Sequence, residues 1–239
     1  QICYFIDRWY MYVGHIQSMT DETIHQRAKL LKRIILSSDR LRGFAQCPLL
    51  LTLMALLDTW RGGSLPEKRE KLYAEAVDLL LDCWERQRVV RKDEGRIVLV
   101  FPSLVEWLKV QERDEVRSSL NQLAYEAHAD QASRRPMLDI PSGKLIDRLM
   151  AINQNPEVEP QRLVDYLSRR AGLLVPRGMD RYAFPHRVFQ EYLAACYLTD
   201  SGYPDRVAAL AHKDPEHWGA VALLAGAKSA GGREFALWA

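Results

Sequence analysis

The segment from Gly172 to Leu198 constrains the fold of this chain more than any other, because a short hairpin passes directly into a helix. Leu173 to Val175 are predicted to form one strand, and the residues around Tyr182 and Phe184, which alternate with polar neighbours, form the other. A turn from Pro176 to Asp180, containing Gly178, joins them. The segment therefore predicts a β-hairpin followed at once by a helix.

His186 lies where the second strand ends and the helix begins. A histidine beside an aromatic hairpin is usually structural, but the free N–H groups of a helix start favour an anion. This position makes His186 a candidate phosphate contact. The helix is predicted from an apolar stripe at three- and four-residue spacing, with Gln190, Glu191 and Ala195 off the stripe; the stripe consists of Val188, Phe189, Tyr192, Leu193, Cys196 and Tyr197.

The rest of the sequence is predicted to be mainly helical, with a possible small strand from Ile97 to Val100. Thr20 is expected to cap a helix that begins at Asp21. The predicted helices are a first one through Tyr12, Asp21–Leu36, Leu41–Gln46, Leu49–Trp60, Lys68–Arg88, a turn at Val105–Val110, Glu115–Ala129, Gly143–Ile152, Pro160–Arg170, Pro204–His212 and Pro215–Ala227. Three helices followed by a hairpin indicate a winged helix, here flanked by helical bundles.

Composition excludes several classes of function. The 239 residues include 33 basic and 31 acidic side chains, so no overall field attracts nucleic acid or an anionic membrane. No apolar run approaches the roughly 18 residues of a membrane span. The cysteines, which lack metal-ligand spacing, are expected to be reduced, structural thiols within apolar helical runs, as suits the cytoplasm; they are Cys3, Cys47, Cys83 and Cys196.

Catalytic motifs are not found in the sequence. The pair Gly143-Lys144 resembles the end of a phosphate-binding loop, but Leu138 and Leu145 occupy the positions that need glycine and Ser or Thr. No G-x-S-x-G elbow is present. The chain itself is therefore not expected to hydrolyse ATP.

Arginines gather around the predicted hairpin and leave duplex DNA binding open as an alternative function. Against it, the helix that would enter a groove carries Asp165, with Glu157 and Glu159 before it. Salt-dependent DNA binding that is lost without the hairpin arginines would favour this alternative. The arginines are Arg169, Arg170, Arg177, Arg181 and Arg187.

Four motifs in order resemble NACHT-type STAND NTPases, the group that includes NOD-like receptors and bacterial antiphage sensors. AFPHRVFQEYLAACYL, at 183–198, resembles the F-x-H-x-x-F-Q-E-Y-L-A-A motif, and FAQCPLLLTLMALL, at 44–57, resembles N-P-L-L-L-T-L-M. LPEKREKLYAEAVDLLLDCW, at 65–84, is similar to L-P-x-x-R-x-x-L-Y, and LSRRAGLLV, at 167–175, to L-S-x-R-S-G-L-L. The resemblance extends from about Phe5 to Ala225.

The resemblance implies three parts. Residues 1–62 would be helical domain 1 of a NACHT module, residues 63–200 a winged-helix domain, and residues 201–239 the start of a second helical domain. It also implies a longer protein whose NTPase core lies upstream, as the start at Gln1 without a methionine suggests. That core would bind ADP or ATP with Mg²⁺, and the whole protein would be a cytoplasmic ATPase that oligomerises when active, with a role in antiphage or innate-type defence.

By the same resemblance, Pro48 would pack on the adenine and His186 would contact the β-phosphate of ADP in a closed state. Cys47 stands where the family usually has another small or polar residue. Because cysteine is also small, this difference has little effect on the role expected for Pro48. The implied partners are the upstream core and further copies of the protein. No membrane partner is expected, and the balanced charge disfavours nucleic acid, which stays the alternative given above. A structural scaffold module is the other alternative, favoured if His186 is buried and bonded to backbone.

Overall fold

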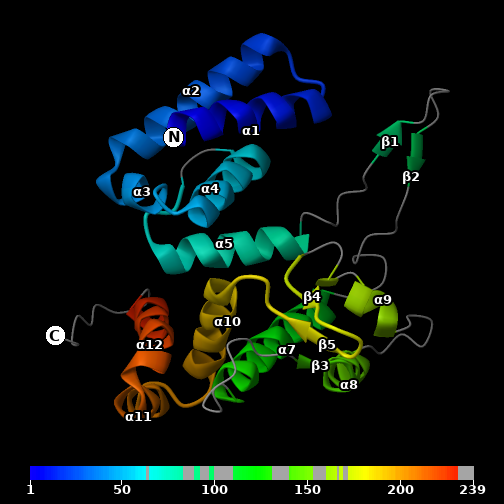
Figure 1. Cartoon of the computed structure of the whole chain (residues 1–239), viewed down its shortest axis with the longest axis vertical. Helices are drawn as coiled ribbons and strands as arrows, with labels where there is room; N and C mark the ends of the chain where they lie inside the picture. Colours follow the sequence, from blue (N-terminus) through cyan, green and yellow to red (C-terminus); the bar gives the residue numbers. More distant parts are fainter. Residues whose placement is uncertain are drawn as a thin grey trace. The chain divides into compact units, whose positions relative to one another are not determined.

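The structure, a computed structural model, describes residues 1–62, 65–82, 89–91, 97–99, 110–130, 140–152, 160–165, 167–168 and 172–230. Most of these residues are helical, as predicted. The chain divides into two compact units, Gln1–Leu79 and Leu80–Ala239 (Figure 1). The predicted division after residues 62 and 200 stays a prediction.

Four helices make up most of the first unit: α1 (Ile2–Ile16), α2 (Asp21–Ser37), α3 (Asp39–Phe44) and α4 (Pro48–Arg61). Helix α1 continues to Ile16, beyond Tyr12, where the prediction ended it, and Gly14 in this last part allows a close approach to α2. A Cβ at Gly14 would lie 2.3 Å from Ile24 Cδ1. Ile6, Tyr10 and Gly14, four residues apart, are the buried side of α1.

The starts of α2 and α3 are fixed by hydroxyl caps. Thr20 Oγ1 accepts the backbone N–H of Thr23 at 3.3 Å, which confirms the predicted cap. Ser38 Oγ accepts the N–H of Leu41 at 3.4 Å in the same way. Each cap satisfies one of the N–H groups that a helix start leaves without an intrahelical partner.

Helix α5 (Arg69–Asp82) runs from the first unit into the second. Its predicted continuation to Arg88 lies outside the described residues. Strand β2 (Ile97–Leu99) confirms most of the predicted strand, and it pairs antiparallel with β1 (Val89–Arg91), which was not predicted.

The second unit contains a winged helix. Its elements are α7 (Val110–Ala129), β3 (Ile140–Pro141), α8 (Ser142–Ile152), α9 (Pro160–Asp165), β4 (Val175–Pro176) and β5 (Arg181–Ala183). The three strands form one antiparallel sheet in the order β3-β5-β4. The predicted turn at 105–109 and part of the predicted extension of α9 to Arg170 lie outside the described residues.

The hairpin differs from the prediction in the bounds of its strands and turn. Pro176 belongs to β4 and pairs with Tyr182, so the turn begins one residue later than expected. Arg177 N–H donates to Arg181 O at 2.7 Å across this turn. Leu173 and Leu174 precede the strand, and their N–H groups donate to Leu167 O at 3.2 and 3.3 Å. The sequence did not predict strand β3, because a strand of two residues is too short to show an alternation of apolar and polar side chains.

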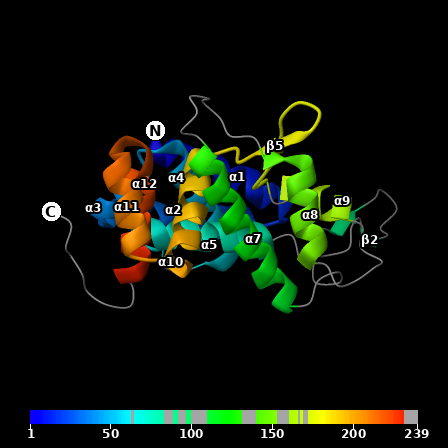
Figure 2. The ribbon, with the colours of Figure 1, turned by 90° about the horizontal axis from the view of Figure 1, so that it is seen from below.

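Helix α10 (Arg187–Asp200) follows the wing and packs against α7 and α12 (Pro215–Ala230), with α11 (Asp205–Lys213) before α12 (Figure 2). The predicted stripe on α10 is buried or half-buried, but Gln190, Glu191 and Ala195, which the prediction placed off the stripe, are buried as well. A helix covered on several sides buries more than one face.

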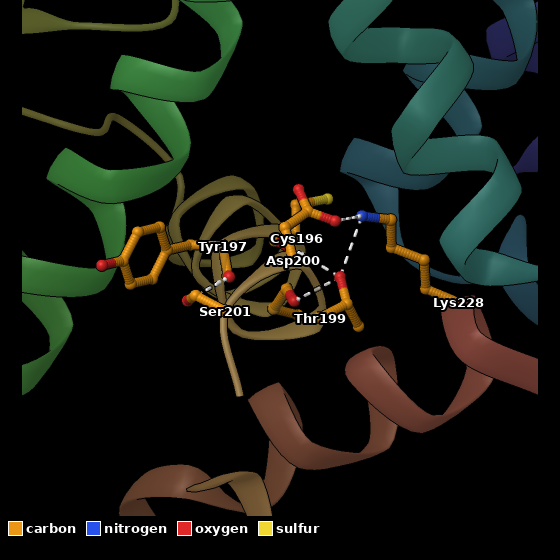
Figure 3. A network of polar contacts seen from close by, with 7 residues as sticks. Cys196, Tyr197, Thr199, Asp200, Ser201 and Lys228 are labelled. Atoms are coloured by element: carbon orange, nitrogen blue, oxygen red, sulfur yellow. Dashed lines mark hydrogen bonds and ion pairs between the residues drawn. The ribbon is translucent and has the colours of Figure 1, made fainter. Parts of the chain in front are cut away.

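A polar network joins the last turn of α10 to the last turn of α12 (Figure 3). Lys228 Nζ donates to Thr199 Oγ1 at 2.9 Å and to Asp200 Oδ1 at 3.3 Å. Within the described part of the chain, no helix is long and apolar enough to cross a membrane.

Candidate functional site

His186 is the N-cap residue of α10, and its side chain is exposed. Its extended backbone (φ −126°, ψ 121°) lets its carbonyl oxygen accept the N–H of Phe189 at 3.0 Å and that of Gln190 at 3.5 Å. The imidazole meets the Phe189 ring edge-on, with ring centroids 6.1 Å apart. Among the described residues, no hydrogen bond holds the imidazole. The condition that would favour a purely structural scaffold is therefore not met.

The start of α10 carries a positive field with little local compensation. The helix has no side-chain cap, so first-turn N–H groups remain for a ligand or water. Arg187 Nε donates to Glu191 Oε1 at 2.7 Å, so the positive charge of Arg187 and the negative charge of Glu191 offset each other.

Pro48 is the first residue of α4, and it is exposed. Proline suits this position because its missing N–H would have no intrahelical partner. Cys47, the N-cap, provides no side-chain hydrogen bond. Pro48 lies in the wall of a pocket of about 530 Å³ within the first unit, between the start of α1 and the α3–α4 connection.

The pocket wall is mainly apolar and contains no charged side chain. Its lining residues are Gln1, Ile2, Cys3, Phe5, Ala45, Gln46, Pro48 and Leu51. Phe5 stacks on Trp9, whose Nε1–H donates to Thr59 Oγ1 at 2.9 Å, and this ties the wall to α4. Such a surface suits the flat face of a neutral ring better than a phosphate.

The prediction that the cysteines are small hydrophobes within apolar runs is wrong for two of them. Cys3 and Cys47 are exposed free thiols, because they lie at the starts of α1 and α4 and not on the buried faces. Cys196, in the middle of α10, is buried as predicted. Cys83 lies outside the described residues.

The predicted arginine cluster is exposed where the structure describes it. Arg177, Arg181 and Arg187 are exposed, whereas 169 and 170 lie outside the described residues. Met179, between the first two, is fully exposed at the tip of the wing. Among the described residues, no group of three or more His, Cys, Asp or Glu is placed to hold a metal ion.

Two buried polar pairs were missed by the sequence analysis. In the first unit, Tyr10 O–H donates to Asp58 Oδ2, and burial, the largest influence, raises the pKa of both groups. In the second unit, His128 and His217 bond to each other's backbone. The partners are 48 and 89 positions apart, so no local pattern in the sequence announces them.

Comparison with known proteins identifies the family. No curated protein matches this chain. The family model described as a winged helix-turn-helix domain C-terminal to NACHT matches residues 69–198, more than half of the chain. The match runs from the start of α5 into α10 and includes His186, whereas Pro48 precedes it. The mainly helical fold with its small three-stranded antiparallel sheet agrees with this match. The chain therefore belongs to the family of winged-helix domains that follow NACHT, and is part of a NACHT-type NTPase.

Proposed function

We propose that this chain is the nucleotide-sensing switch of a NACHT-type NTPase. In this account an NTPase core elsewhere in the same protein binds ADP or ATP with Mg²⁺. His186 hydrogen-bonds to a phosphate of ADP, and Pro48 covers the adenine. Loss of the His186 contact would favour an open state in which the protein oligomerises and signals.

The exposed, unbonded imidazole of His186 is the single observation that carries this proposal. Its ring nitrogens have no competing partner among the described residues, and the N-terminus of α10 adds a favourable field for an anion. A hydrogen bond to a charged group contributes about 1.5 to 3 kcal/mol. A contact made only in the closed state would therefore shift the closed-to-open balance roughly 10- to 150-fold.

The pocket beside Pro48 supports the second contact. The face that Pro48 presents is apolar and exposed, and the pocket volume of about 530 Å³ lies in the range of small-molecule sites. A proline ring has no donor, so it would contribute shape and apolar contact and leave the phosphates to other groups. Pro48 and His186 belong to different units of the chain.

The proposal is tested in the full-length protein with His186→Ala. Release of a fluorescent ADP analogue is followed by stopped flow, and the oligomeric state by light scattering. We expect release to be roughly 10- to 150-fold faster and the oligomer to form more readily, because the closed state loses a contact. His212→Ala is the matched control, since His212 is also exposed in the second unit. If His186→Ala releases the ADP analogue at the wild-type rate and oligomerises as the wild type does, His186 does not have the proposed role.

A further inference from the structure

His128 and His217 form a reciprocal contact between α7 and α12. His128 Nε2 lies 3.0 Å from His217 O, and His217 Nε2 lies 2.7 Å from His128 O. A carbonyl oxygen only accepts, so each imidazole must carry its hydrogen on Nε2. The neutral tautomer of each ring is therefore fixed by the backbone of the other.

The two rings are packed tightly. They stack with centroids 4.1 Å apart and an interplanar angle of 14°. Trp218 meets both rings edge-on, at 4.8 Å from His128 and 5.3 Å from His217. His128 has no exposed surface, and its Nδ1 has no hydrogen-bond partner among the described residues.

The charged groups that the structure describes around the pair offer no free negative charge to stabilise a protonated, positively charged His128. From α10, the cationic Arg187 acts on His128, and its own partner is Glu191. Next to His128 on α7, Glu126 is already paired with Lys144 and Arg148 of α8. Before α12, Asp214 Oδ1 accepts the backbone N–H of His217 at 3.1 Å.

Protonation of His128 would place a new N–H on Nδ1, where no acceptor is available and where a second imidazole is stacked. A buried charge without a partner is strongly disfavoured. We propose that His128 and His217 form an acid-labile clasp, which holds the start of α12 to the end of α7 at neutral pH and opens as the pH falls.

The direction of the pH dependence follows from burial. Burial, then His217 and Arg187, lower the pKa of His128 from 6.5 to about 4 in the closed clasp. In the open clasp the ring is hydrated and recovers its ordinary pKa, so the open state takes up a proton first. The closed state is therefore fully favoured above pH 6.5 and loses stability between pH 6.5 and pH 4. For one histidine, the opening constant rises about 20-fold between pH 7 and pH 5.

Hydrogen exchange measured by mass spectrometry on the whole chain tests the clasp. Exchange of α12 is compared at pH 7 and pH 5 after correction for the intrinsic rate. The variant His128→Gln keeps a donor for His217 O but does not titrate. The matched control is His25→Gln, since His25 is exposed on α2 with a local contact to Asp21 O at 2.8 Å. Helix α4 contains no histidine and serves as the internal reference.

We expect α12 to open about 20-fold more at pH 5 in the wild type and in His25→Gln, and to show no such rise in His128→Gln. An unchanged wild type, or an equal rise in His128→Gln, overturns the proposal. If His128→Gln does not fold, the test uses the wild type alone and compares the exchange of α12 with that of α4. A rise in α12 that is absent from α4 supports the clasp, and an equal rise in both helices overturns it.

Discussion

His186 and His128 lie in the same unit but in opposite environments. His186 is exposed at the start of α10, and its imidazole has no hydrogen-bond partner among the described residues. His128 is fully buried, bonded to the backbone of α12 and stacked on a second histidine. The difference separates two roles for one residue type: a ring that is free to meet a ligand, and a ring that holds two helices together.

The first unit repeats this contrast. Pro48 is exposed in the wall of a pocket, whereas Tyr10 and Asp58 are buried and bonded between α1 and α4. Residues of the first kind should change ligand binding with little effect on stability, because little is lost when an exposed side chain is shortened. Residues of the second kind should change stability first.

The largest expected difference is between His128→Ala and His186→Ala. Removing the buried ring of His128 leaves a cavity beside Trp218 and breaks its hydrogen bond to His217 O, so we expect the free energy of unfolding to fall by about 3 kcal/mol. His186→Ala should change it by less than about 0.5 kcal/mol. Urea unfolding of the two variants at pH 7 measures both. Equal losses would show that the contrast between the two histidines is wrong.

Sequence patterns located His186 because its position depends on local order: a hairpin, a proline and a helix follow one another along the chain. His128 and His217 could not be paired in this way, since they meet only when α7 and α12 both pack on α10. The apolar stripe of α10 was recognised, but the burial of Gln190 and Glu191 was not. Burial of a polar residue depends on neighbours from other elements, which no periodicity shows.

An intermediate effect is expected for Tyr10→Phe. This change leaves Asp58 buried without the hydroxyl donor, so we expect a loss of about 1 to 3 kcal/mol in the free energy of unfolding. Pro48→Ala, in the same unit, should cost at most about 1 kcal/mol, mainly through the unfolded chain. Thermal or urea unfolding distinguishes the two. A larger loss in Pro48→Ala than in Tyr10→Phe would contradict the assignment of the exposed and buried roles.

Among the changes at bonded residues, Lys228→Met should have the smallest effect. Lys228 joins Thr199 and Asp200 at the ends of α10 and α12, but Asp200 is largely exposed and solvent screens the pair (Figure 3). We expect a loss of at most about 1 kcal/mol that shrinks in high salt. Lys213→Met, an exposed change at the end of α11, is the control. A loss as large as that of His128→Ala would show that the Lys228 network contributes as much to stability as the buried histidine pair, and would contradict this ranking.

The central claim is that His186 contacts a phosphate of bound ADP. A structure of the full-length protein with ADP measures this contact directly, as the distance from the imidazole nitrogens of His186 to the nearest phosphate oxygen. We predict a hydrogen bond of about 2.7 to 3.2 Å in the closed state. An imidazole that lies beyond hydrogen-bond reach of every phosphate oxygen, with ADP fully bound, would contradict the account.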